Sequence, residues 1–355
     1  MLTGKFRKQP STAPTFASVL EKSLGKTICD DFYFPYARKI WGREPEELSA
    51  LQATRRVSAA SFTKLVRKIL LKGGGAGRGG ARRFFYPRRG YGQITEAYAD
   101  AAKGLGAEFL MSTEVTTIKR AGDTSTDGWS ISAKSDEASL NIDADYVWST
   151  IPVTLLPRLI DPAPDQTILA AAGGMHYRAM LLVYLELGVG TFTEYDAHYF
   201  PGAEIAITRL SEPKNYSTVS VPEGRTTLCA ELPCAPDDHL WRSTDAELGS
   251  LVTRDLERAG IPLPGEPLSV HVKRLRHAYP IYLNGHEAPL TVLDTWVTGI
   301  PDLLTYGRQG LFAHDNTHHA LFMAYSAVDC LVEGEFDKAK WEDYRRVFAK
   351  HVVED

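Results

Sequence analysis

Alternating apolar and polar residues recur along the second half of the chain. The pattern covers five segments, at 177–187, 198–210, 217–222, 226–233 and 268–282. Neighbouring side chains of a strand point to opposite faces, so this alternation is typical of a sheet with one covered face. A helical stretch at 243–260 interrupts the strands, with Ser243 or Thr244 suited to cap it and Gly260 suited to end it. The pattern predicts a mostly antiparallel sheet with a helix beside it.

The remaining segments predict a mixture of helices and further strands. Helices are expected at 15–25, from after Pro45 to 57, at 59–72, at 90–103, at 317–334 and at 337–353. Strands are expected at 114–122, 129–134 and 139–152. The most apolar segment, 168–190, contains Gly173, Gly174, His176 and Arg178, so it predicts a buried strand rather than a transmembrane helix. Together these segments predict an α+β fold with about two lobes.

Composition narrows the classes of partner. A net charge of −4 over 355 residues gives no general attraction to nucleic acid or to anionic membranes. The four cysteines are scattered, without the paired spacing of a zinc site, and predict free thiols in a reducing cytoplasm. The first 16 residues lack the apolar stretch of a signal peptide.

Two short motifs suggest ligands but lack the required context. Gly75, Gly77 and Gly80 have the spacing of a dinucleotide-binding loop, but a basic helix rather than a strand precedes them, which favours a linker. His314 and His318 are four residues apart, yet Asp315 stands where a zinc protease has Glu, so no metal site is predicted.

A third motif is better supported. Gly307, Arg308 and Gly310 form a turn signal, and Asn316 and Thr317 then begin a helix. The first N–H groups of a helix have no intrahelical acceptor and attract negative charge. This stretch therefore predicts a helix start facing an anionic ligand.

Several segments together resemble one superfamily of flavoproteins. They lie in order at 32–50, 84–109, 114–119, 145–152, 209–217, 278–285 and 307–321. The sequence resembles FAD-dependent amine oxidases and protoporphyrinogen oxidase-like proteins, and more distantly UDP-galactopyranose mutase. The resemblance implies an α+β fold with an FAD/NAD(P)-binding lobe at 84–164 and 300–355, a β-rich substrate lobe at 165–299 and a helical segment at 1–72. Such proteins begin with a strand, a Gly-x-Gly-x-x-Gly loop and a helix, which this sequence lacks, so the FAD-binding lobe is expected to be incomplete.

The resemblance also implies roles for individual residues. The residues implied to contact FAD are Val115, Gly307, Arg308, Gly310, Asn316 and Thr317. The residues implied to face the substrate are Arg88, Arg209, Tyr279 and Tyr282. Structural alternatives stay open: a plain tight turn for the glycines, a core position for Val115, a surface ion pair for Arg308, a pair with Glu212 for Arg209 and packing for Tyr282. No catalytic residue is implied.

Three functions remain in consideration. The first is an FAD-dependent oxidoreductase that removes a hydride from a small organic substrate. The second is a substrate-binding or scaffold module without FAD, and the third is a non-redox flavin-dependent sugar-nucleotide mutase. Without the phosphate-binding loop, FAD is expected to bind weakly or not at all. An open sheet edge near 145–152 is expected to pair with a partner chain or a second copy.

Overall fold

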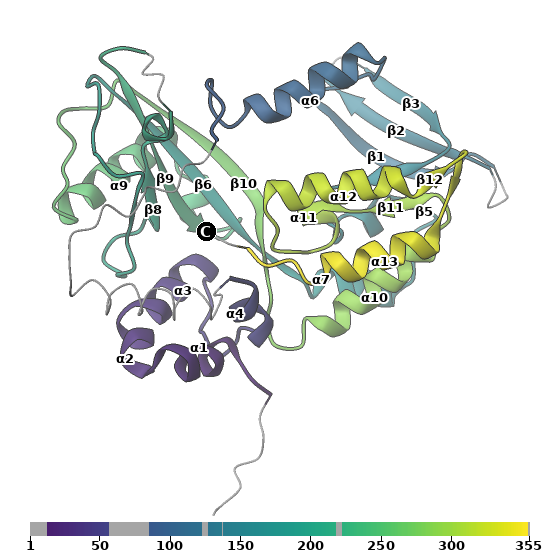
Figure 1. Ribbon diagram of the computed structural model, residues 1–355, viewed down its shortest axis with the longest axis horizontal. Coiled ribbons are helices and arrows are strands. Elements are labelled where there is room, and N and C mark those ends of the chain that lie inside the picture. Colours follow the sequence, from purple (N-terminus) through teal and green to yellow (C-terminus); the bar gives the residue numbers. More distant parts are fainter. Residues whose placement is uncertain (1–12, 57–84, 123–126, 137, 218–221, 354–355) are drawn as a thin grey trace, which may run out of the picture.

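The computed structural model describes residues 13–56, 85–122, 127–136, 138–217 and 222–353. The helix expected at 59–72 and the glycines at 75, 77 and 80 lie outside these residues. Figure 1 shows three parts: a β-rich lobe, a group of N-terminal helices beneath it, and a second lobe of sheets and helices beside both. The chain is therefore α+β, as the sequence predicts.

The β-rich lobe is built on a five-stranded antiparallel sheet, which confirms the strands expected at 177–187, 226–233 and 268–282. The segment 198–210 is not one strand, because only its two ends pair in the sheet, and most of 217–222 lies outside the described residues. The strand order of the sheet is β10 (Ser269–Ile281), β6 (His176–Leu187), β9 (Thr226–Cys234), β8 (Arg209–Ser211) and β7 (Ala197–Tyr199). Helix α9 (Asp245–Arg258) covers one face and buries Leu248, Val252 and Leu256 completely. Gly249 permits this close approach, since a Cβ there would lie 2.8 Å from Val270 Cγ2.

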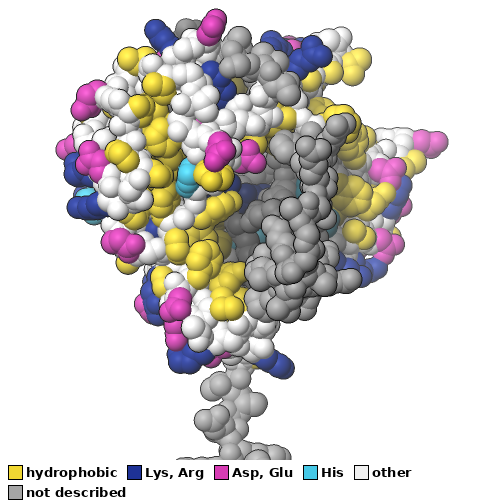
Figure 2. Space-filling model, turned by 60° about the vertical axis from the view of Figure 1, so that its left-hand side comes forward, with side chains coloured by type: hydrophobic (Ala, Val, Ile, Leu, Met, Phe, Trp, Pro, Cys, Tyr) yellow, Lys and Arg dark blue, Asp and Glu magenta, His cyan; other side chains and the backbone are white. Residues whose placement is uncertain are grey.

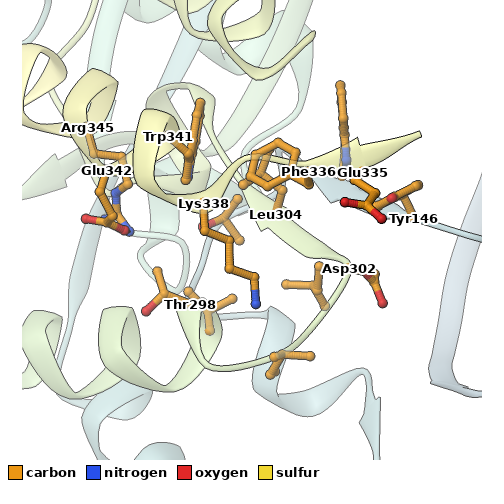
Figure 3. A pocket seen from close by; sticks show the side chains of 15 residues that line it. Tyr146, Thr298, Asp302, Leu304, Glu335, Phe336, Lys338, Trp341, Glu342 and Arg345 are labelled. Carbon is orange, nitrogen blue, oxygen red and sulfur yellow. The ribbon is translucent and has the colours of Figure 1, made fainter. Parts of the chain in front are cut away.

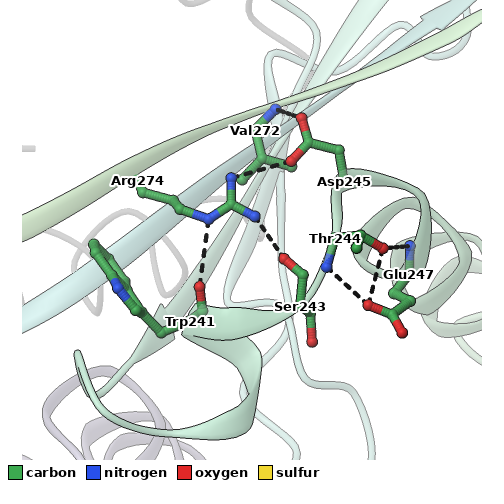
Figure 4. Close-up of polar contacts among 7 residues, drawn as sticks. All are labelled: Trp241, Ser243, Thr244, Asp245, Glu247, Val272 and Arg274. Atoms are coloured by element: carbon green, nitrogen blue, oxygen red, sulfur yellow. Dashed lines mark hydrogen bonds and ion pairs between the residues drawn. The ribbon is translucent and has the colours of Figure 1, made fainter.

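The start of α9 is held by hydrogen bonds within its own first turn and by hydrogen bonds to the sheet (Figure 4). Thr244 is the N-cap and forms a capping box with Glu247, so the second of the two expected caps is the one used. Asp245 accepts hydrogen bonds from Val272 N at 3.0 Å and from Arg274 Nη1 at 3.0 Å. The carboxylate thus joins the positive end of the helix to strand β10.

Among the described residues, the second lobe contains two main sheets and a short two-stranded hairpin. One has the order β3 (Ser139–Ala144), β2 (Trp129–Ser135), β1 (Thr113–Arg120) and β5 (Ile160–Asp161). The other pairs β4 (Val147–Ser149) with β11 (Leu303–Thr305) in parallel. The single strand expected at 139–152 is therefore wrong. Its ladder with β2 ends at Ala144, and the chain then enters a different sheet.

The N-terminal helices form a small core of their own. They are α1 (Phe16–Leu24), α2 (Lys26–Ile28), the π-helix Cys29–Tyr33, α3 (Phe34–Trp41) and α4 (Ala50–Arg56). Their apolar side chains pack with Leu48 and with Ile281 at the end of β10. Arg178 of β6 donates to Ile40 O at 2.9 Å and to Lys39 O at 3.2 Å, so it satisfies carbonyls at the end of α3. These contacts attach the helices to the β-rich lobe.

The other helices lie mainly in the second lobe. They are α6 (Gln93–Gly104), α7 (Gln166–Gly173), α8 (His239–Arg242), α10 (Glu287–Thr298), α11 (Gly307–Gly310), α12 (Thr317–Asp329), α13 (Lys338–Phe348) and the 3₁₀ turns Leu156–Arg158 and Pro213–Tyr216. The helix expected at 317–334 ends at Asp329, because a short hairpin of β12 (Leu331–Val332) and β13 (Glu335–Phe336) follows it. Helix α10 has no counterpart among the expected elements. It packs on α7, and its Val297 is buried against Leu303 of β11.

The surface and the thiols complete the fold. On the face that carries the β-rich lobe, apolar side chains gather across the middle of the view and charged ones lie mostly toward its margins (Figure 2). All four cysteines are buried free thiols, as their spacing predicts. Among the helices that the structure describes, none has the length and apolar character needed to span a lipid bilayer.

A buried carboxylate provides the first testable prediction. Glu212 is 0% exposed and accepts from Phe192 N at 3.0 Å, Thr193 N at 2.9 Å and Thr226 Oγ1 at 2.6 Å. An amide cannot accept at its nitrogen, so Glu212→Gln is expected to lower the free energy of unfolding by about 2 kcal/mol or more. Urea denaturation measures the change. The matched control Glu257→Gln, at an exposed position of α9, should leave stability unchanged; equal effects would contradict the assignment.

Candidate functional site

A break in the register of β10 positions the site. Its pairing with β6 shifts between Leu275 and Tyr279, so residues 276–278 face a single residue of the neighbouring strand. Such bulges bend a strand and redirect its side chains. The carbonyl of His277, inside the bulge, accepts a hydrogen bond from Gln309 Nε2. The bulge is therefore attached to the short helix α11, which carries the Gly-Arg-x-Gly turn.

The two glycines of that turn are required by geometry. Gly307 has φ of +77°, in the left-handed region that favours glycine. At Gly310 a Cβ would lie 3.1 Å from Ser149 O, so only glycine lets α11 pack this closely on β4. Both residues are buried. They act here as a tight turn, which is one of the roles that the sequence left open.

Arg308 and Tyr279 meet between the turn and the bulge. The guanidinium carbon lies 4.5 Å from the centre of the Tyr279 ring, a cation–π contact. The same ring meets Trp41 edge-on at 5.8 Å and lies 6.5 Å from the His314 ring. Tyr279 is thus held by aromatic neighbours from α3 and from the segment before α12.

A cavity of about 430 Å³ opens at the start of α12, and we call it the helix-start pocket. It is lined by Tyr91, Arg308, Asp315, Asn316, Thr317, His318 and Ala320. Asn316 is the N-cap, and its backbone N–H donates to His319 Nδ1 at 3.1 Å. The next N–H groups of the first turn have no acceptor within the helix. Together with Arg308 they make this pocket suited to a negatively charged ligand.

A smaller cavity of about 90 Å³ lies on the β-rich lobe, and we call it the Arg209 cavity. It is lined by Tyr36, Ile40, Met180, Tyr199, Thr208, Arg209, Glu231 and Tyr279. Arg209 forms its ion pair with Glu231 of the neighbouring strand, so the alternative pairing with Glu212 is wrong. Burial opposes the charge on Arg209, but Glu231 and Tyr199 outweigh it and raise its pKa above the ordinary value. Burial raises the pKa of the Tyr36 hydroxyl well above its usual range.

The other residues expected at a site lie elsewhere. Val115 is 37% exposed and sits at an irregularity in β1. Tyr282 is 3% exposed, donates to Phe312 O at 2.9 Å and stacks on His286 at 4.5 Å, so its side chain serves the core. Arg88 lines a separate cavity, together with Lys214 and Arg225. Arg308, Asn316 and Thr317 therefore share one pocket, while Arg209 and Tyr279 share another.

The structure adds residues that the sequence did not single out. Tyr91 enters the helix-start pocket, and Tyr36, Tyr199 and Glu231 enter the Arg209 cavity. Tyr36 lies within one of the segments that carry the family resemblance, which is the only signal that pointed toward it. Glu231 is one polar position in an alternating strand, and only the pairing of β8 with β9 places it opposite Arg209.

A further cavity, of about 280 Å³, lies beside the parallel pair β4 and β11 (Figure 3). Apolar side chains of Trp148, Leu304, Phe336 and Trp341 line it, and Lys338, Glu342 and Arg345 reach it from α13. None of the residues expected at a site is among its lining residues. This cavity is distinct from the helix-start pocket and from the Arg209 cavity.

Comparison with known proteins decides the family. The sequence profile of the flavin containing amine oxidoreductases matches residues 1–319. The chain belongs to this family. No curated protein sequence matches the chain.

Solved structures of flavoproteins share the fold of this family member. Reduced UDP-galactopyranose mutase aligns with a TM-score of 0.73 at 18% identity, over 98% of this chain and 74% of that one. A putative protoporphyrinogen oxidase from Exiguobacterium sp. 255-15 aligns at 0.59 and 19% identity, over 86% and 64%. Wild-type putrescine oxidase bound to putrescine aligns at 0.55 and 16% identity, over 84% and 64%. The chain thus spans about three quarters of the mutase and just under two thirds of the two oxidases.

The described residues suit one part of a flavin dinucleotide. The start of α12 offers N–H donors, and Arg308 brings a positive charge to the same pocket. A strand–glycine loop–helix unit, which holds the pyrophosphate in dinucleotide-binding folds, does not occur within the ranges that the structure describes. The residues present therefore fit the contacts made by α12 and α11 and supply no second phosphate-binding turn.

The geometry of the turn gives the second prediction. Gly307→Ala is expected to lower the free energy of unfolding by about 1 kcal/mol or more, because a Cβ is strained at positive φ. Chemical denaturation of the two proteins measures the difference. Gly265→Ala is the matched control, since a Cβ there meets open space at ordinary φ. If both variants are as stable as the parent, the left-handed turn at Gly307 is refuted.

Proposed function

We propose that this chain is an FAD-dependent oxidoreductase that removes a hydride from a small organic substrate. The observation that supports it is the contact between Arg308 and Tyr279. Arg308 lines the helix-start pocket, and its guanidinium lies over the Tyr279 ring, which lines the Arg209 cavity. A group bound at the helix start is thereby next to a cavity in the β-rich lobe. Bound FAD would supply the hydride acceptor.

The residues of the chain then bind and orient. The first turn of α12 and Arg308 would face the electron-rich edge of the cofactor. In the Arg209 cavity, the ion pair of Arg209 with Glu231 and the hydroxyls of Tyr36 and Tyr199 supply a few fixed polar groups in a mostly enclosed space. Such groups set the orientation of a small ligand. We assign no proton transfer to any of them.

The proposal includes a division of labour along the chain. Residues 84–164 and 300–355 would make the cofactor-binding lobe, and 165–299 the substrate lobe. The helical segment within 1–72 attaches to the substrate lobe through Arg178 and the α3 carbonyls. Buried free thiols suit a reducing compartment, so a cytoplasmic location is part of the proposal.

A non-redox flavin-dependent mutase acting on a sugar nucleotide is the second candidate. The observation that favours it is the fuller alignment with reduced UDP-galactopyranose mutase, over 98% of the chain. An identity of 18% shows the fold and leaves the reaction open. The two reactions differ in outcome, because the oxidoreductase releases an oxidised product and the mutase an isomer. Mass spectrometry of the product separates them.

Binding of FAD tests the proposal directly. The part of the chain that the structure describes contains no pyrophosphate-binding turn, so the site it forms lacks several charge-assisted hydrogen bonds, each worth roughly 1.5–3 kcal/mol. We expect weak, dialysable binding, with a dissociation constant on the order of 10 µM or higher. Arg308→Met should weaken it roughly ten-fold or more by removing a charged donor. Titration followed by flavin fluorescence measures both constants.

The control for this titration is Arg346→Met. Arg346 is exposed on α13 and pairs with Asp343, away from the helix-start pocket. It should bind FAD as the parent does. If flavin fluorescence does not change even at the highest FAD concentration, the proposal is overturned and the alternative of a binding module without FAD is favoured. Binding that is insensitive to Arg308→Met would show that the cofactor site lies elsewhere.

The proposed partner is a chain that adds a strand to the β4–β11 pair. Within the ranges that the structure describes, β4 and β11 pair only with each other, and both are three residues long. Unpaired edges recruit further strands. Strand β11 is buried, whereas Val147 and Trp148 of β4 are partly exposed, so β4 offers the more accessible edge. Trp148 and Leu304 of this pair also line the apolar cavity of Figure 3, so an added segment would have apolar surface to cover. A second copy of the chain is the simplest such partner.

Light scattering at increasing protein concentration tests this association. We expect the mass per particle to rise above that of the monomer, because strand addition is a mass-action equilibrium. Amide exchange at 147–149 should slow as the particle grows. A monodisperse monomer over the whole concentration range would contradict self-association through this edge.

A further inference from the structure

Three side chains meet where the C-terminal segment reaches the start of α12. Asp315 precedes the N-cap of α12, His319 lies in its first turn, and His351 follows α13. Asp315 Oδ1 lies 3.3 Å from His319 Nδ1 and 3.1 Å from His351 Nδ1. The side chains are 0%, 12% and 10% exposed, respectively. They form a compact, mostly buried cluster, which we call the Asp–His cluster.

We propose that the Asp–His cluster binds a divalent transition-metal ion, with zinc as the natural candidate. One atom from each of the three side chains lies within 4.8 Å of the others. Zinc takes imidazole nitrogen and carboxylate oxygen at about 2.0–2.2 Å, usually in a tetrahedron. Two ligands of such a tetrahedron are about 3.3 Å apart, from those bond lengths. The two separations measured from Asp315 Oδ1 agree with this spacing.

The state of Asp315 supports a cation. Its second oxygen, Oδ2, is buried and has no hydrogen-bond partner among the described residues. Leaving a carboxylate oxygen buried and unpaired is costly, and a bound cation offsets this cost. Among the residues that the structure describes, the ion pairs of Asp315 are with His319 and His351, and none is with a Lys or Arg side chain.

The contacts of His319 point the same way. Its Nδ1 accepts from Asn316 N at 3.1 Å and lies 3.3 Å from Asp315 Oδ1. An imidazole nitrogen either accepts or donates, so these two contacts cannot both be hydrogen bonds. An ion between Nδ1 and Oδ1 resolves the conflict and takes the place of the Asn316 N–H.

The arrangement of the chain shows what the ion would hold in place. Arg55 of α4 donates to Ala349 O at 2.8 Å and to His351 O at 3.0 Å. The His319 and His351 rings stack nearly parallel, with centres 4.2 Å apart, so one ring would have to turn to direct its Nδ1 at a shared ion. The ion would therefore join a C-terminal segment that α4 positions to the first turn of α12. This site is separate from the pair His314 and His318 that the sequence raised, because neither is part of the cluster.

Metal titration of the full chain tests this site and does not depend on flavin. After treatment with a chelator, Zn²⁺ is added in the presence of a chromophoric competitor, and Co²⁺ is added separately for its ligand-field spectrum. We expect one Zn²⁺ per chain and a tetrahedral Co²⁺ spectrum. His351→Ala should weaken Zn²⁺ binding by roughly 10–100-fold or more. Loss of a residue that only supports a ligand already costs that much, and His351 is a ligand itself.

Two further variants complete the experiment. His239→Ala is the control, because His239 is exposed on α8 and absent from the cluster and from the helix-start pocket, and it should bind Zn²⁺ as the parent does. Asp315→Asn keeps the shape and removes the charge, so it should weaken binding even if His351→Ala alters folding. Circular dichroism confirms that each variant is folded. Failure of the folded parent to bind Zn²⁺, or equal affinity in His239→Ala and Asp315→Asn, would overturn the proposal.

Discussion

The antiparallel pairing of β6 with β10 is the constraint on which the rest of the structure depends. The two strands are 12 and 13 residues long and are neighbours in the sheet of the β-rich lobe. At one end they carry the core beneath α9, and at the other Ile281 enters the core of the N-terminal helices. Because they are so long, a local irregularity in one of them sets the geometry of everything attached beyond it. That irregularity is the bulge before Tyr279.

The bulge connects the two lobes through a small number of contacts. Its carbonyl at His277 holds Gln309, and Gln309 lies in the turn that leads from β11 into α12. Arg308 of this turn then reaches Tyr279, which follows the bulge. A helix start and a cavity in another sheet are thereby fixed relative to each other. The close packing of Gly310 on Ser149 makes the same turn dependent on β4.

Local patterns predicted most elements, and their failures have physical reasons. The strands at 177–187, 226–233 and 268–282 and the α9 cap follow from side-chain period and capping chemistry, which depend on neighbours in sequence. The strand expected at 139–152 failed because β3 and β4 follow each other with hardly a turn signal, yet pair in different sheets. The hairpin after Asp329 was not predicted, because a short pair of strands gives little periodicity. Helix α10 is absent from the expected elements although Leu290, Leu293 and Val297 recur at helical spacing.

The sequence by itself determined the α+β class, the antiparallel sheet, the helix start at Asn316 and membership of the flavoprotein family, since each depends on local residue order. Tertiary structure alone decided which of these residues meet. Arg209 pairs with Glu231 rather than with Glu212, and Tyr282 is buried in the core while Tyr279 lines a cavity. Asp315, His319 and His351 likewise come together only because α13 returns the chain to α12. Such contacts join residues far apart in the chain, and no local pattern encodes the register and packing that bring them together.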